Sequence, residues 1–188
     1  MIKLIATDID GTLVKDGTLI INPEYMTVIS KLIDKGIIFT VCSGRQFSSE
    51  QKLFAPIKDK LMYITDGGTV VRTPDRILKT YPMSNELWKD MCRMVRDELP
   101  ACDYFAASPD LCYAEDGASP IFHRLRDSYG FEMREIDDMT KLENDDIIKF
   151  TVYHPDSCEE LCSPHFIPAW KDKAHVTSAG KEWVDCNH

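Results

Sequence analysis

Residues Asp8-Ile9-Asp10-Gly11-Thr12 follow directly on the apolar run Ile2-Lys3-Leu4-Ile5-Ala6-Thr7, and this stretch decides how the first half of the chain folds. The apolar run predicts a buried strand, and the residues after it predict a turn at its carboxyl end. Because side chains alternate between the faces of a strand, Asp8 and Asp10 leave the backbone on the same side. Gly11 lets the backbone approach a ligand closely, as an aspartate-based phosphoryl-transfer site requires. The stretch is equally typical of an ordinary turn after a strand.

A second predicted strand favours a ligand site over an ordinary turn. The run Ile37-Ile38-Phe39-Thr40-Val41-Cys42 predicts another buried strand, and it ends in Ser43-Gly44-Arg45. A hydroxyl, a glycine and a guanidinium at the end of a strand suit the recognition of a phosphate group. Two such strand ends side by side form the edge at which open α/β sheets bind their ligands.

The segment between the two strands predicts the helix of a βαβ unit. Asn22 and Pro23 are typical of a helix start, and Gly36 is typical of the position just past a helix end. Strands that are apolar nearly throughout are typical of a parallel sheet buried on both faces. The stretch from Val14 to Ile20 contains an Asp-Gly pair flanked by apolar residues and predicts a hairpin.

Asp8-Ile9-Asp10-Gly11-Thr12-Leu13 and Ser43-Gly44-Arg45 resemble the first two motifs of the haloacid dehalogenase-like superfamily. Their spacing, and a third strand over 61–65 that runs into Asp66-Gly67-Gly68, resemble the Cof-type sugar-phosphatase branch. The resemblance covers residues 1–81 and implies an α/β fold, with the first half of a Rossmann-like parallel core. It also implies magnesium-dependent hydrolysis of phosphate esters through an aspartyl-phosphate, with sugar phosphates as the expected substrates.

The resemblance implies specific roles for the residues that match the family's motifs. Asp8 would be the nucleophile, and Asp10 would protonate the leaving oxygen and later deprotonate the attacking water. The Asp8 carboxylate and the Asp10 carbonyl would ligate Mg²⁺. The residues expected at the phosphate or substrate are Gly11, Thr12, Ser43, Gly44 and Arg45.

Residues 82–188 predict a second domain, which resembles the branch's inserted α+β cap in layout and length. Ser84 is expected to cap a helix that runs through Leu99, and Ser119-Pro120 to open a helix that Gly130 closes. Strand signals without strict alternation with helices indicate an antiparallel sheet. The strands are expected over 102–107, 111–115, 147–154, 176–178 and 182–186.

Two parts of the family pattern have no match in the chain. A core helix with a lysine and a strand ending in Gly-Asp-x-x-x-Asp would follow the cap, and Lys181 lies in a predicted hairpin turn instead. We therefore expect a chain truncated after the cap and weakly active, because phosphoryl transfer depends on charge neutralisation. The strand that bears Asp8 would have an open edge through which the chain could self-associate. A phosphomutase, and a binding or assembly module without catalytic activity, remain alternatives.

Composition limits the partners and the location. The net charge of −9 argues against a nucleic-acid or anionic-membrane surface, although it allows a small phosphorylated metabolite as substrate. No run is long and apolar enough to span a bilayer, and a cytoplasmic location is the simplest expectation. The odd number of cysteines, seven, predicts reduced thiols, and their spacing argues against structural zinc.

Overall fold

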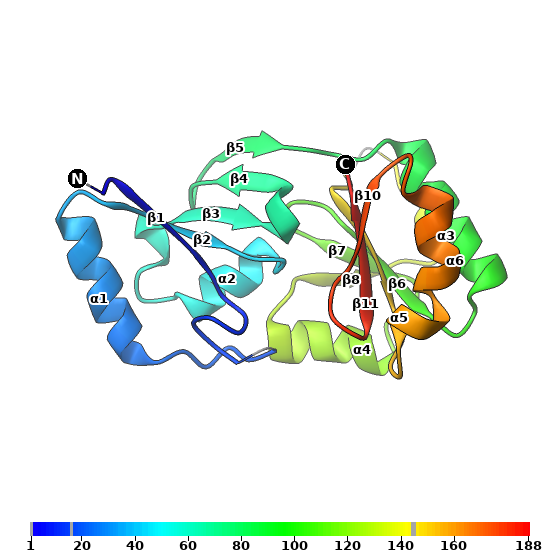
Figure 1. The fold of residues 1–188 in the computed structure, drawn as a ribbon, viewed down its shortest axis with the longest axis horizontal. Helices are drawn as coiled ribbons and strands as arrows, with labels where there is room; N and C mark the ends of the chain where they lie inside the picture. The colour runs from blue at the N-terminus through cyan, green and yellow to red at the C-terminus, as the bar shows by residue number, and fades with distance from the viewer. Residues whose placement is uncertain (1, 16, 144–145) are drawn as a thin grey trace. The chain divides into compact units, whose positions relative to one another are not determined.

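The structure, a computed structural model, describes residues 2–15, 17–143 and 146–188 (Figure 1). The contacts within the chain divide it into two units. Unit 1 comprises Met1–Thr80 together with Arg124–Glu132, and unit 2 comprises Tyr81–His123 together with Met133–His188. The Arg124–Glu132 segment therefore packs with unit 1 although its neighbours in the sequence belong to unit 2.

Unit 1 contains a five-stranded sheet in the order β1-β2-β3-β4-β5. The first three strands, β1 (Leu4–Asp8), β2 (Ile38–Cys42) and β3 (Met62–Thr65), are parallel, as the apolar runs predicted. The predicted burial of β1 is wrong, because none of its five residues is buried. The last two, β4 (Val70–Arg72) and β5 (Ile77–Thr80), extend the sheet in antiparallel fashion. The α/β fold class and the parallel first half of the core are confirmed.

The crossover helix α1 (Pro23–Asp34) joins β1 to β2 and has the predicted ends. The Asn22 side chain accepts a hydrogen bond from the backbone N–H of Glu24 at 3.0 Å, which satisfies a donor at the helix start. Gly36 has a φ of +80°, a conformation that glycine adopts without a steric penalty, and it reverses the chain into β2. A shorter helix, α2 (Phe47–Leu53), follows β2. The core of unit 1 comprises Ile9, Val14, Ile29, Phe39, Val41, Phe47, Leu53, Phe54, Ile57, Leu61 and Tyr63.

One further expectation for unit 1 is wrong, and one hairpin was missed. The hairpin predicted over 14–20 is not formed as a ladder by the described residues, and its Asp16 lies outside them. Val14 instead forms an isolated bridge with Asp10, because Val14 accepts a hydrogen bond from the Gly11 N–H and donates one to Ile9. The β4–β5 hairpin was missed, because its strands are only three and four residues long and too short to show an alternating pattern.

Unit 2 is built on a six-stranded sheet in the order β10-β11-β9-β6-β7-β8. All neighbouring strands are antiparallel except β7 and β8, which agrees with the predicted α+β cap. The strands are β6 (Asp103–Ala107), β7 (Cys112–Ala114), β8 (Met133–Glu135), β9 (Lys149–Tyr153), β10 (His175–Ser178) and β11 (Trp183–Asn187).

Three helices of unit 2 pack on one face of this sheet, and Figure 1 shows them on the same side of the strands. They are α3 (Asn85–Glu98), α5 (Cys158–Leu161) and α6 (Ser163–Trp170). The Ser84 hydroxyl accepts a hydrogen bond from the Leu87 N–H at 3.3 Å, so the predicted cap of α3 is present. The buried side chains of this face include Trp88, Met91, Val95, Phe150, Val152, Phe166 and Val184.

The predicted helix between Ser119 and Gly130 forms in two parts. A short helix α4 (Pro120–His123) continues as a wider π-helical segment, η3 (Arg124–Tyr129), and Gly130 ends it with a φ of +74°. Within the described ranges, no helix combines the length and apolar character needed to cross a membrane.

We predict that residues 82–188 fold as a unit of their own, because unit 2 has its own sheet and its own apolar core. The expressed fragment is expected to unfold cooperatively in urea, followed by circular dichroism. Trp88→Ala should destabilise it by about 3–5 kcal/mol, because Trp88 is fully buried. The exposed Leu161 provides the control, and Leu161→Ala should change little. A featureless, non-cooperative transition of the fragment would contradict an independent domain.

Candidate active site

The carboxyl ends of the three parallel strands meet at one edge of the unit 1 sheet. Asp8, the last residue of β1, lies opposite Cys42, the last residue of β2. The next residue, Ser43, donates its N–H to the carbonyl of Ile64 in β3 at 3.0 Å. The Asp8 and Ser43 motifs, which are 35 residues apart, are therefore brought together as the sequence predicted.

Backbone hydrogen bonds fix the Ser43–Arg45 loop against the turn after β3. The N–H of Asp66 donates to the Arg45 carbonyl at 2.9 Å, and the N–H of Gly67 donates to the Ser43 carbonyl at 3.1 Å. The Ser43 hydroxyl accepts the N–H of Arg45 at 3.2 Å, and this bond leaves the hydroxyl's own hydrogen for another acceptor. Ser43 is therefore held in place, and its hydroxyl can donate a hydrogen bond to a phosphoryl oxygen.

Arg45 and Asp10 form a bidentate ion pair. Nε and Nη2 of Arg45 donate to the two Asp10 carboxylate oxygens at 2.7 and 2.6 Å. Arg45 is only 2% exposed, and its Nη1 donates to the Ser49 hydroxyl at 3.4 Å. The sequence placed Arg45 at the phosphate, whereas in the structure its guanidinium binds the carboxylate that is expected to handle the proton.

At the end of β1, Asp8 is an exposed side chain, whereas Gly11 shapes the turn that follows. Asp8 is exposed, and its Oδ2 accepts the Thr12 hydroxyl at 3.3 Å. Gly11 has a φ of +76°, and its N–H donates to the Val14 carbonyl at 2.8 Å. The Gly11 amide is thus used within the turn, so the glycine shapes this turn and does not offer its N–H to an anion here. Gly44 lies in the loop beside Ser43.

The Asp8 carboxylate and the Asp10 backbone carbonyl fit a magnesium ion in type, while both oxygens of the Asp10 carboxylate are bound by Arg45. Asp8 and Asp10 supply hard oxygen ligands at a strand end, and Mg²⁺ is commonly held by one or two carboxylates together with waters and a substrate phosphate. No group of three or more His, Cys, Asp or Glu side chains that could hold a metal occurs among the described residues.

Two buried carboxyl groups lie behind this edge, and the sequence did not indicate either as part of a site. Asp66 is fully buried, has a φ of +52°, and accepts the Thr65 hydroxyl at 2.8 Å. Glu50, in the first turn of α2, is also fully buried, and neither carboxylate oxygen has a hydrogen-bond partner within the described part of the chain. Burial, with the nearby Asp66 carboxyl, raises the pKa of Glu50 well above its usual value.

Cys42, the last residue of β2, is a second side chain that could act as a nucleophile. Its environment does not activate it. Burial, together with the acidic groups of Glu50 and Asp8, raises the pKa of the Cys42 thiol. Because the thiolate is the reactive form, these surroundings disfavour cysteine chemistry and leave Asp8 as the exposed candidate nucleophile.

The Arg124–Glu132 segment adds an aromatic side chain that the sequence did not assign. The Arg45 guanidinium carbon lies 5.4 Å from the centroid of the Tyr129 ring, within the range of a cation–π contact. Two residues of the α2 region anchor the end of the segment. Gln46 accepts the N–H of Glu132 at 2.7 Å, and Lys52 donates to the Gly130 carbonyl at 2.8 Å.

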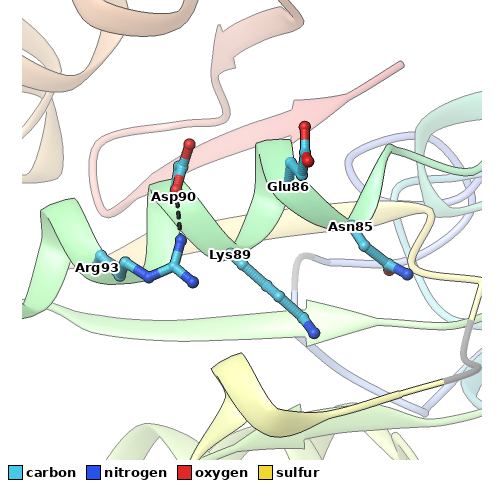
Figure 2. A pocket seen from close by; sticks show the side chains of 5 residues that line it. All are labelled: Asn85, Glu86, Lys89, Asp90 and Arg93. Atoms are coloured by element: carbon cyan, nitrogen blue, oxygen red, sulfur yellow. Dashed lines mark hydrogen bonds and ion pairs between the residues drawn. The ribbon is translucent and has the colours of Figure 1, made fainter.

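A hollow on the surface of unit 2 has a different character. Figure 2 shows it along α3, where its lining side chains come from this one helix. Asp90 and Arg93 form an ion pair with each other, so two of its charges are already matched. The lining residues are Asn85, Glu86, Lys89, Asp90 and Arg93, and no strand end contributes to it. The edge of the unit 1 sheet is therefore the candidate active site.

Comparison with curated proteins shows similarity to two phosphatases. The chain is 26% identical over 147 residues to the 5-amino-6-(5-phospho-D-ribitylamino)uracil phosphatase YbjI of Escherichia coli, covering 76% of this chain and 52% of that protein. It is 32% identical over 87 residues to the phosphatase of the same name, YwtE, of Bacillus subtilis, covering 46% and 30%. The chain thus spans about half, or less, of the length of these relatives.

Solved structures show the same architecture. A crystal structure of a protein from Eubacterium rectale is 80% identical, with a TM-score of 0.86, and covers 99% of this chain and 70% of that chain. The sugar phosphatase BT4131, of subclass IIB, shares the fold with a TM-score of 0.76 at 16% identity, over 98% and 69% of the two chains. The model of the haloacid dehalogenase-like hydrolase family matches residues 5–188. With its strand-end aspartates and this match over nearly its whole length, the chain belongs to the haloacid dehalogenase-like hydrolase family.

Proposed function

We propose that the site hydrolyses small phosphate esters through an aspartyl-phosphate on Asp8. The observation that carries the proposal is the meeting of three groups at one sheet edge: the exposed Asp8, the Asp10 carboxylate held by Arg45, and the Ser43 hydroxyl. Because phosphoryl transfer needs positioned charge and hydrogen-bond donors more than covalent chemistry, these groups suit it.

In the first step, an Asp8 carboxylate oxygen attacks phosphorus and the bond to the leaving oxygen breaks. Asp10 donates a proton to that oxygen and, in the second step, accepts one from the water that hydrolyses the acyl phosphate. Ser43 donates its hydroxyl hydrogen to a phosphoryl oxygen. Asp8 is free to attack because its contact with Thr12 is long, at 3.3 Å, and the carboxylate is exposed.

Mg²⁺ is the cofactor that fits this donor set, with the Asp8 carboxylate and the Asp10 carbonyl as its protein ligands. When bound, it offsets the negative charge that Asp8 and the phosphate would otherwise bring together. Arg45 is too deeply buried to neutralise an incoming phosphate from solvent, so it serves the reaction by orienting Asp10.

We propose a phosphorylated sugar or sugar alcohol as the substrate class. The curated relatives are named for a substrate that carries a phosphorylated ribityl group, which is a sugar-alcohol phosphate. As such metabolites arise in the cell interior, a cytoplasmic location follows from this proposal. We propose no nucleic-acid or membrane partner, in keeping with the net charge of −9.

Asp8→Asn tests the nucleophile. Assayed with Mg²⁺ in the 188-residue chain and in a form extended to the length of the relatives, it should reduce phosphate release by about three orders of magnitude or more. It should also abolish trapping of phosphate on the protein, because an amide is a poor nucleophile. Asp34→Asn, at an exposed position in α1, is the control. Substantial turnover by Asp8→Asn would exclude the proposed role, and phosphate returned to a sugar, without net release, would indicate a phosphomutase.

The edge strand β1 generates a second prediction. Within the described ranges β1 pairs with β2 alone, and Leu4 and Ile38 near this edge are 54% and 51% exposed. An apolar strand edge of this kind favours pairing with another chain. The 188-residue chain should therefore be a dimer or larger species by light scattering, and Leu4→Lys should shift it toward monomer. A monomer at the concentrations used for scattering would contradict the prediction.

A further inference from the structure

Tyr129 has no part in the proposed reaction, yet it lies against the cation that holds Asp10. The Arg45 guanidinium carbon lies over the Tyr129 ring, 5.4 Å from its centroid. The same guanidinium donates to both Asp10 carboxylate oxygens, at 2.7 and 2.6 Å. Tyr129 and Arg45 are both buried, and an aromatic ring attracts a cation most strongly where water is excluded. The aromatic ring therefore helps to set the place of the cation that orients Asp10.

An unusual helix presents the Tyr129 ring to Arg45. The segment η3 (Arg124–Tyr129) is π-helical, a wider form whose hydrogen bonds join residues five apart and which is frequent at functional sites. The Arg124 guanidinium carbon, five residues before Tyr129, lies 5.8 Å from the centroid of the same ring. On the unit 1 side, a Cβ at Gly17 would lie only 3.1 Å from the Tyr129 hydroxyl oxygen, so the ring packs closely against that turn.

The Gln46 side chain clamps the end of this segment. Gln46 Oε1 accepts the Glu132 N–H at 2.7 Å, and Gln46 Nε2 donates to the Glu132 carbonyl at 3.4 Å. The Ser48 hydroxyl donates to Gln46 Oε1 at 2.6 Å, which fixes the direction of the amide. Gln46 is fully buried and follows Arg45 directly in the chain. The clamp and the cation therefore belong to the same loop.

A second link to the segment is more exposed. Lys52 Nζ donates to the Gly130 carbonyl and to Glu132 Oε1, each at 2.8 Å. The Lys52 and Glu132 side chains are 46% and 58% exposed, and ion pairs in such surroundings contribute little to stability. The buried amide of Gln46 is therefore the contact expected to hold the segment, and Lys52 offers a matched control.

We propose that Tyr129 is a positioning residue that acts on Asp10 through Arg45, and that Gln46 seats it by clamping the Arg124–Glu132 segment. The inference rests on the proposed function, in which the Asp10 carboxylate must face the leaving oxygen. Tyr129 excludes water from the guanidinium and limits its rotation, and no bond to Tyr129 forms or breaks. Since both neighbours of the segment in the sequence belong to unit 2, the geometry of the site depends on a piece of chain that unit 2 supplies.

Solvent exchange of the Arg45 Nε–H, followed by heteronuclear NMR in metal-free buffer, tests the proposal without turnover. Tyr129→Leu should speed this exchange about tenfold or more, because water gains access to the guanidinium. Tyr129→Phe keeps the ring and should restore slow exchange. Tyr25→Leu, at an exposed tyrosine of α1, is the control and should leave the exchange unchanged. Unaltered exchange in a folded Tyr129→Leu chain would overturn the proposal.

A double-mutant cycle tests the clamp, and it also carries the test if Tyr129→Leu alone does not fold. Gln46→Met removes both hydrogen bonds to Glu132 and should speed exchange of the Arg45 Nε–H, whereas Lys52→Met should not. In the Tyr129→Leu background Gln46→Met should add little, because the clamp acts through the ring. Equal effects in both backgrounds, or slow exchange in Gln46→Met, would contradict a clamp that acts through Tyr129.

Kinetics give a separate reading in a form extended to the length of the relatives. There Tyr129→Leu should lower kcat about tenfold with little change in KM, because Tyr129 orients a catalytic group and does not bind substrate. A raised KM with unchanged kcat would make Tyr129 a binding residue and overturn the proposal. Absence of turnover in the parent protein would count against the proposed function, while exchange of the Arg45 Nε–H would still decide whether Tyr129 holds Arg45.

Discussion

The buried ion pair between Arg45 and Asp10 is the interaction on which the site depends. Both hydrogen bonds of the pair are short, at 2.6 and 2.7 Å, and the guanidinium is nearly excluded from solvent. A pair of this kind gives little net stability, because desolvation offsets the attraction, but it is costly to break from one side. It therefore fixes the relative position of the turns after β1 and β2, and so the direction of the carboxylate that is proposed to move the proton.

The backbone around this pair makes the arrangement rigid. The bonds that join Ser43 and Arg45 to Ile64, Asp66 and Gly67 run between consecutive strand ends. They are main-chain bonds, so side-chain substitution in the loop leaves them available. The hydroxyl of Ser43 and the guanidinium of Arg45 consequently project from a frame that the sheet itself supplies. The side chain most free to react, Asp8, is also the one with the fewest constraints.

The sequence predicted the elements whose signals are local. The capped helices α1 and α3 and the parallel strands followed from Asn22, Ser84 and two apolar runs, and the structure confirms them. The short strands β4 and β8 were not predicted, because a strand of three residues is too short to show an alternating pattern of apolar residues. In the site, strand-end positions brought Asp8 and Ser43 together as predicted.

Contacts between residues that are distant in the sequence could not be predicted from sequence patterns. A polar helix start does not reveal that Glu50 is buried, because burial depends on how distant parts of the chain pack together. The pairing of Arg45 with Asp10, over 35 residues, likewise depends on how two turns face each other. Tyr129 approaches Arg45 from a segment that lies between two strands of the other unit in the sequence.

Asp66 has a consequence beyond its place in the turn. Its φ of +52° lies in a region that residues other than glycine adopt at a cost of about 1 kcal/mol, although Asp and Asn tolerate it best. Its carboxyl group is also the strongest charged influence on Glu50. Glycine at this position would relax the backbone, and asparagine would keep its shape, but either would withdraw a negative charge from behind Arg45. One residue thus couples the geometry of a turn to the acidity of the site, so evolution or design cannot adjust the first without altering the second.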